Sequence, residues 1–160
     1  MSHLPITDAA IRAWRALDYA PSARWVKWAV EQLVAGRDGG NLRILAGLTE
    51  PFDTFDTKRF TDNALAEVGV EPLTQNAAIL SYAQELVATL IERPTLTAEV
   101  LSELAALCVD AGYPKLLMPF YLLHFARQDL QSSAEQHYWD GAGRLEYRLN
   151  CRQRSSPLAN

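Results

Sequence analysis

Apolar residues recur at helical spacing through most of the chain. From Thr7 to Leu130 they return every three or four residues, which places them on one face of an α-helix. Breakers interrupt the pattern, most clearly Pro21, the glycine-rich stretch 36–40 and Arg93-Pro94. No stretch alternates between apolar and polar residues as a half-buried strand would. The pattern therefore predicts an all-α fold.

Capping and breaking residues divide this pattern into six or seven predicted helices. The helices are predicted to begin near Thr7, Ser22, Asn41, Asp53, Thr74 or Asn76, Thr97 and Lys115. They are predicted to end near Leu17, Gly36, Leu48, Gly69, Arg93, Ala111 and Leu130. Because the spacing is irregular and carries no repeated signature, a solenoid is not expected. We expect one globular helical bundle or array over residues 1–150, with a flexible C-terminal tail over residues 151–160.

Composition places the chain among ordinary globular proteins. It has 160 residues, of which 49% are hydrophobic and 21% charged, enough for one domain with a real core. Residues 1–5 lack a basic stretch followed by an apolar run, and no apolar stretch is long enough for a membrane span, so we expect a cytoplasmic protein without membrane contact. Cys108 and Cys151 do not form a disulfide framework. Cys108 fits the core, and Cys151 is expected to be a free thiol.

Charge is distributed unevenly along the chain. The formal net charge is -4, which argues against direct nucleic-acid binding. Residues 50–110 hold eleven acids and three bases, and the segments on either side are mildly basic. Most of these acids fit a solvated surface or helix starts. Four of them cluster near one helix start and are the candidates for an acidic face that attracts a basic partner: Glu50, Asp53, Asp56 and Asp62.

The sequence contains no recognisable catalytic, metal or cofactor motif. His3, His124 and His137 do not have metal-ligand spacing, and His124 fits a packed position on an apolar helix. The glycine-rich stretch 36–40 follows a helix and lacks Gly-Lys-Ser/Thr, so it is predicted to be a turn. Asp53 and Asp56 could serve as an acid–base pair, but helix capping explains them more simply. We therefore expect a protein that is not an enzyme.

Bulky aromatic residues are candidate interface anchors as well as core residues. Trp25 lies on the predicted core face of its helix, and Trp28 lies about 60° away from that face. Tyr138 and Trp139 stand together in a stretch with a weak helical pattern. We therefore add Tyr138 and Trp139 to the predicted partner-binding residues.

Two stretches of the chain resemble small helical bacterial proteins encoded in toxin–immunity settings. The first is Leu45-Ala46-Gly47-Leu48-Thr49-Glu50-Pro51 with Phe60, Ala64-Leu65 and Val68-Gly69. The second is Tyr113-Pro114-Lys115 with Phe120-Tyr121-Leu122-Leu123, Ala126, Asp129-Leu130 and Gln136-His137-Tyr138-Trp139. Together they are similar to immunity proteins of contact-dependent growth inhibition. The resemblance implies an antitoxin that binds and blocks a cognate toxin domain, commonly a nuclease, without catalysis.

Two other classes of function stay open at this level. A small-ligand-binding protein or enzyme would use an inter-helix pocket lined by polar side chains such as Tyr82, Tyr121, His124 and Asp129. A nucleic-acid-binding domain would use the basic C-terminal residues Arg144, Arg148, Arg152 and Arg154, against the overall negative charge.

Overall fold

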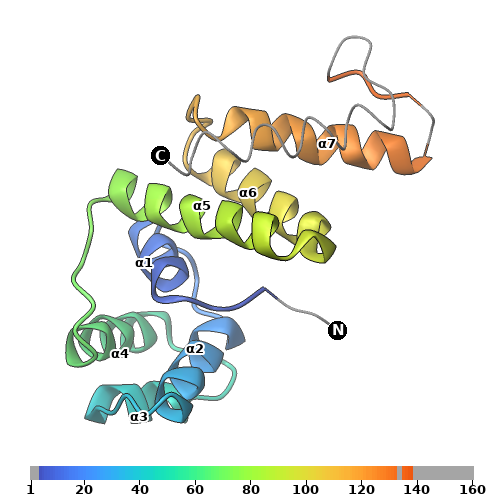
Figure 1. Ribbon diagram of the computed structural model, residues 1–160. Helices are drawn as coiled ribbons and strands as arrows, with labels where there is room; N and C mark the ends of the chain where they lie inside the picture. Colours follow the sequence, from blue (N-terminus) through green and yellow to red (C-terminus); the bar gives the residue numbers. More distant parts are fainter. Residues whose placement is uncertain (1–3, 133–134, 139–160) are drawn as a thin grey trace. The chain divides into compact units, whose positions relative to one another are not determined.

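A computed structural model describes residues 4–132 and 135–138 of the chain. These residues contain seven α-helices and no strand, which confirms the all-α prediction (Figure 1). The helices belong to two compact units. The N-terminal unit is Pro5–Ala78, and the C-terminal unit holds Leu4 and the described residues from Ile79 onward. The single domain over residues 1–150 stays a prediction, and the tail 151–160 lies outside the described residues.

Caps and breakers set the ends of the helices. The N-terminal unit contains α1 (Asp8–Ala16), α2 (Ala23–Val34), α3 (Gly40–Ala46), α4 (Thr54–Glu67) and the start of α5 (Gln75–Glu92). The C-terminal unit contains the rest of α5, the 3-10 turn η1 (Pro94–Leu96), α6 (Thr97–Asp110) and α7 (Met118–Ser132). As predicted, Thr7 caps α1 by accepting a hydrogen bond from the amide of Ala10 at 3.2 Å.

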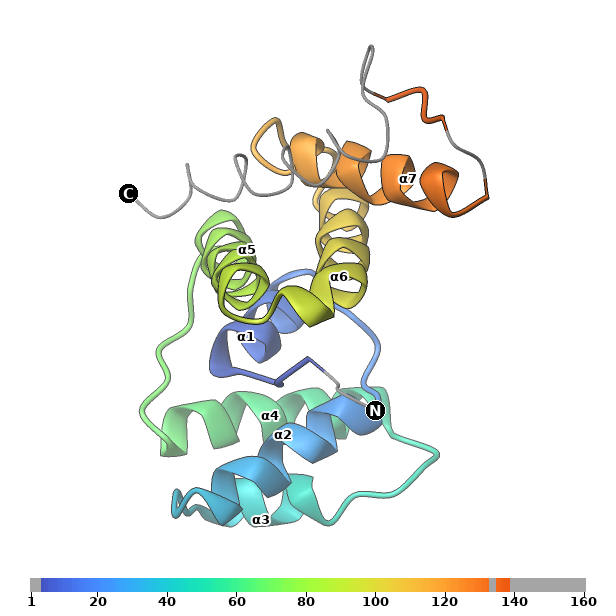
Figure 2. The ribbon, with the colours of Figure 1, turned by 45° about the vertical axis from the view of Figure 1, so that its right-hand side comes forward.

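The core of the N-terminal unit is built on tryptophan and leucine. Helix α3 packs against both α2 and α4 (Figure 2). Trp25 and Trp28 of α2 are fully buried, as are Leu42 and Leu45 of α3. The indole N–H of Trp28 donates a hydrogen bond to Asp8 at 3.0 Å, which satisfies its polar group inside the core. Trp28 is therefore a core residue despite its offset from the face of Trp25.

The C-terminal unit has a core of leucines between α5, α6 and α7. Helix α6 packs against α7, and the Tyr82 hydroxyl of α5 donates a hydrogen bond to Glu103 of α6 at 2.8 Å. Cys108 is buried, as predicted, with its thiol 3.9 Å from the sulfur of Met118. The largest fully buried side chains of this unit are Leu96, Val100, Leu101, Leu104, Leu107, Leu117 and Leu123.

The end of α4 agrees with the predicted glycine cap, and the start of α7 differs from the predicted one. Gly69 follows α4 with a φ of +74°, and Val70 donates its amide to the carbonyl of Leu65, as the predicted glycine cap requires. Helix α7 starts at Met118 instead of the predicted Lys115. The reason is Pro119, whose ring would clash with the carbonyl of Lys115 inside a longer helix but fits the first turn of the observed one.

Candidate partner-binding surface

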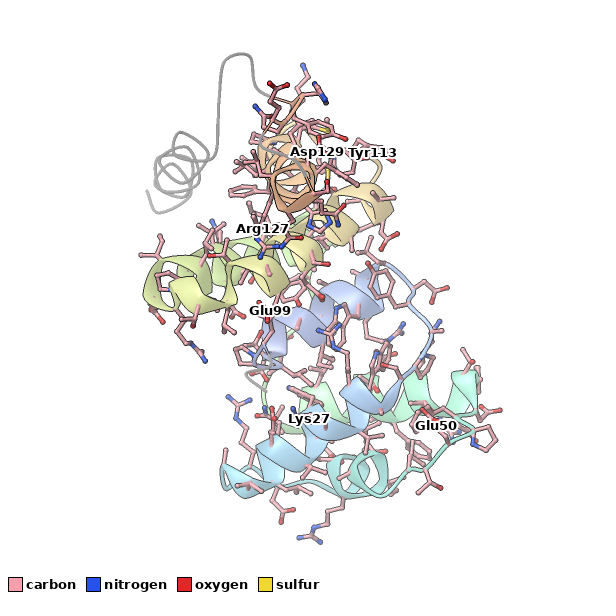
Figure 3. The ribbon with its side chains drawn as sticks, turned by 90° about the vertical axis from the view of Figure 1, so that its right-hand side faces the viewer. Lys27, Glu50, Glu99, Tyr113, Arg127 and Asp129 are labelled. Atoms are coloured by element: carbon pink, nitrogen blue, oxygen red, sulfur yellow. The ribbon has the colours of Figure 1, made fainter. Side chains whose placement is uncertain are left out.

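Three of the four acidic residues that the sequence singled out lie at or just before the start of α4. Asp53 is the N-cap of α4 and accepts a hydrogen bond from the amide of Asp56 at 2.7 Å. This cap fixes the turn that leads into the helix, where Glu50 is exposed (Figure 3). Asp53 is exposed as well. The structure thus places Glu50, Asp53 and Asp56 on one short stretch, with Asp62 further along α4.

An exposed phenylalanine lies among these acids. Phe55 occupies the first turn of α4 and has 75% of its surface exposed. It stands between Asp53 and Asp56 in the chain, and it lies on the opposite side of the helix from the buried Ala64. A large apolar side chain in such a place stays in contact with water unless another molecule covers it. We name Glu50, Asp53, Phe55 and Asp56 the Phe55 surface.

Phe55 was not among the predicted binding residues, although the sequence carries a signal for it. Phe55 and Ala64 are nine residues apart, which corresponds to a half-turn difference around a helix at about 100° per residue. Once Ala64 is assigned to the core, Phe55 is therefore expected on the opposite side of the helix.

Asp56 and Asp62 form ion pairs with arginines of the same chain. Asp56 forms an ion pair with Arg59 at 2.8 Å, one turn along α4. Asp62 accepts two hydrogen bonds from the guanidinium group of Arg15 in α1, each 2.7 Å long. This bidentate geometry is the strongest that the two groups can form. Asp62 is thus held against α1, whereas Asp53 and Asp56 flank Phe55.

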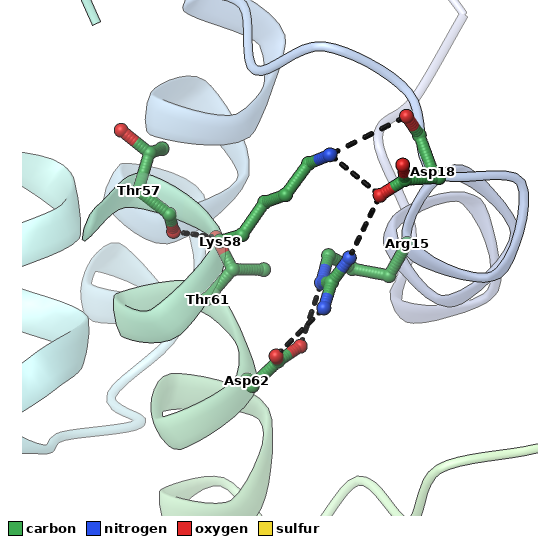
Figure 4. A network of polar contacts seen from close by, with 6 residues as sticks. All are labelled: Arg15, Asp18, Thr57, Lys58, Thr61 and Asp62. Atoms are coloured by element: carbon green, nitrogen blue, oxygen red, sulfur yellow. Dashed lines mark hydrogen bonds and ion pairs between the residues drawn. The ribbon is translucent and has the colours of Figure 1, made fainter. Parts of the chain in front are cut away.

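A second ion pair lies beside the first and joins the same two helices (Figure 4). The ammonium group of Lys58 in α4 lies 2.6 Å from Asp18, which follows α1, and Arg15 lies 3.9 Å from the same carboxylate. The hydrogen bond from Lys58 lowers the pKa of Asp18, and the hydrogen bond to Asp62 raises the pKa of Arg15. Four alternating charges therefore connect the end of α1 to α4.

Asp18 holds an unusual backbone conformation within this network. Its φ is +57°, in the left-handed region where glycine is normally favoured. The position is the glycine site of a helix C-cap, because Tyr19 donates its amide to the carbonyl of Trp14. Aspartate tolerates this conformation better than most residues, and here its carboxylate also reaches Lys58.

The far end of α4 holds α3 in place. The carboxylate of Glu67 accepts hydrogen bonds from the amides of Asn41 and Leu42, with lengths between 3.0 and 3.1 Å, at the start of α3. Desolvation raises the pKa of Glu67, but the hydrogen bonds from Asn41 and Leu42 outweigh it, so the pKa is lowered overall. Gly39 leaves the space for this side chain, since a Cβ there would lie 2.1 Å from a Glu67 oxygen and 2.9 Å from its Cβ.

The predicted aromatic anchors fall in the C-terminal unit. Tyr138 is 40% exposed, and its ring lies 5.9 Å from that of Phe125. Phe125 in turn contacts Tyr121, and Tyr121 contacts Tyr113, with ring centroids 4.8 Å and 5.6 Å apart. Tyr138 is therefore the end of a row of contacting rings along α7. Trp139 lies outside the described residues.

The residues of the alternative pocket hypothesis have different surroundings. Tyr82 bonds to Glu103 between α5 and α6, whereas Tyr121 belongs to the row of rings on α7. His124 shares a 2.9 Å hydrogen bond with Gln128, and burial lowers its pKa, with a further contribution from Arg127. The arginines of the nucleic-acid hypothesis, from Arg144 onward, fall beyond the described residues.

Within residues 4–132 and 135–138, no three side chains of His, Cys, Asp or Glu come together in a way that could hold a metal ion. None of the described helices combines the length and the apolar character needed to cross a membrane.

Comparison of the chain with protein-family models, with curated proteins and with solved structures gave no match. The function must therefore be inferred from the residues of the chain itself.

Proposed function

We propose that this protein is a cytoplasmic immunity protein that binds and neutralises a basic toxin domain. The resemblance of the two sequence stretches to immunity proteins motivates the proposal. The observation that carries it is Phe55, which is 75% exposed beside the exposed residues Glu50 and Asp53. In this proposal the protein acts by covering the toxin, and no reaction takes place on it.

The chemistry of the Phe55 surface supports a basic partner. Interfaces are dominated by a few apolar or aromatic anchors that become fully covered, and Phe55 is suited to this role. Carboxylates at the rim accelerate the encounter with a positively charged surface and disfavour acidic competitors. A nuclease fits this description, because its substrate groove must attract phosphate groups. Tyr138 and Trp139 remain predicted contacts within the proposal.

Co-expression tests the proposal in cells. The neighbouring genes are searched for a toxin domain, the chain is produced together with that domain, and both growth and co-purification at moderate salt are measured. We expect wild-type protein to restore growth and to co-purify with the toxin domain. Loss of both effects, with the chain folded and present in excess, would refute the proposal.

A matched pair of variants locates the surface. Phe55→Ala should weaken toxin binding on the order of thirtyfold, the effect of removing one hot-spot side chain. Val34→Ala is the control, because Val34 is 84% exposed on α2 of the same unit but lies outside the Phe55 surface. Equal affinities of the two variants, measured by calorimetry, would remove the Phe55 surface from the proposal even if the toxin still bound.

A further inference from the structure

We draw no further inference here: the strongest candidate, the row of contacting rings that Tyr113, Tyr121, Phe125 and Tyr138 form along α7, is exposed at both ends, but nothing in the structure shows what covers it.

Discussion

Two positions of the N-terminal unit each need a particular residue, Asp18 after α1 and Gly39 before α3. Asp18 takes a backbone conformation that glycine adopts more easily, and its carboxylate meets Lys58. Gly39 has an extended φ of -178°, which any residue can adopt, so conformation does not explain it. The reason for glycine there is the space that Glu67 needs.

Gly39→Ala should destabilise the protein by about 1–2 kcal/mol, because the new Cβ displaces Glu67 from the start of α3 and removes its hydrogen bonds. Gly40→Ala is the matched control, since its nearest neighbour would be a Glu67 oxygen at an ordinary 3.8 Å. Chemical denaturation measures both variants. If Gly39→Ala were no worse than Gly40→Ala, the steric explanation would be wrong.

Glu67 should also make stability depend on pH. Its pKa is lowered in the folded protein, so its contribution is fully present above its unfolded pKa of about 4.3 and is lost as the pH falls through the lower folded value. The Glu67→Gln variant should lack this acid-dependent component. Thermal unfolding of the wild type and the variant, measured from neutral to acidic pH, checks this prediction. If their melting temperatures changed with pH in parallel, Glu67 would not be the source of the acid dependence.

At the scale of helices, ion pairs hold the α4 helix that carries the Phe55 surface. Arg15 and Asp62 join α1 to α4, as do Asp18 and Lys58. Asp56, the other predicted acid within α4, forms an ion pair with Arg59 of the same helix. We therefore assign Asp62 mainly to positioning α4 and keep Asp53 and Asp56 as the flanks of Phe55.

Asp62→Asn should lower the free energy of unfolding by about 0.5–1 kcal/mol, the upper range for a surface pair with bidentate geometry. The loss should shrink at high salt, which screens the pair in the wild type. Glu31→Gln is the control, because Glu31 meets Lys27 only within α2 and at 3.8 Å. Equal losses in the two variants would show that the α1–α4 geometry adds nothing.

The sequence predicts where the helices begin and end, but it does not predict which side chains distant in the chain form ion pairs. Thr7, Asp53 and Gly69 act through neighbours a few residues away, so their roles follow from local spacing. Arg15 and Asp62 lie 47 residues apart, and nothing in either local pattern signals their contact. Glu50, Asp53 and Asp56 lie near the start of α4, whereas Asp62 lies further along it, and its pairing with Arg15 follows only from the fold.

At the scale of the whole molecule, the acidic block of the sequence is shared between two compact units. Glu50, Asp53, Asp56 and Asp62 belong to the N-terminal unit, where Arg15 and Arg59 partly balance them. Both acids of α5 and all three acids of α6 belong to the C-terminal unit, and α5 and α6 hold no lysine or arginine. The acidic block is therefore divided between the two units, with six of its acids in the first and five in the second.

Salt should slow the association of the protein with the toxin domain far more than it changes their dissociation. Raising ionic strength from about 0.05 M to about 0.5 M should slow association through screening and leave dissociation nearly unchanged. Phe55→Ala should do the opposite and mainly accelerate dissociation. Stopped-flow kinetics separate the two rates, and a salt-independent association rate would exclude electrostatic attraction by the acidic residues.

The most direct measurement of the central claim is a titration of the toxin domain's activity with the purified protein. If the protein neutralises its partner by covering it, activity should fall in proportion to the protein added and vanish at an equimolar ratio, and Phe55→Ala should shift the curve to higher concentrations. Inhibition by far less than an equimolar amount, or toxin activity unaffected by an excess of folded protein, would contradict the account.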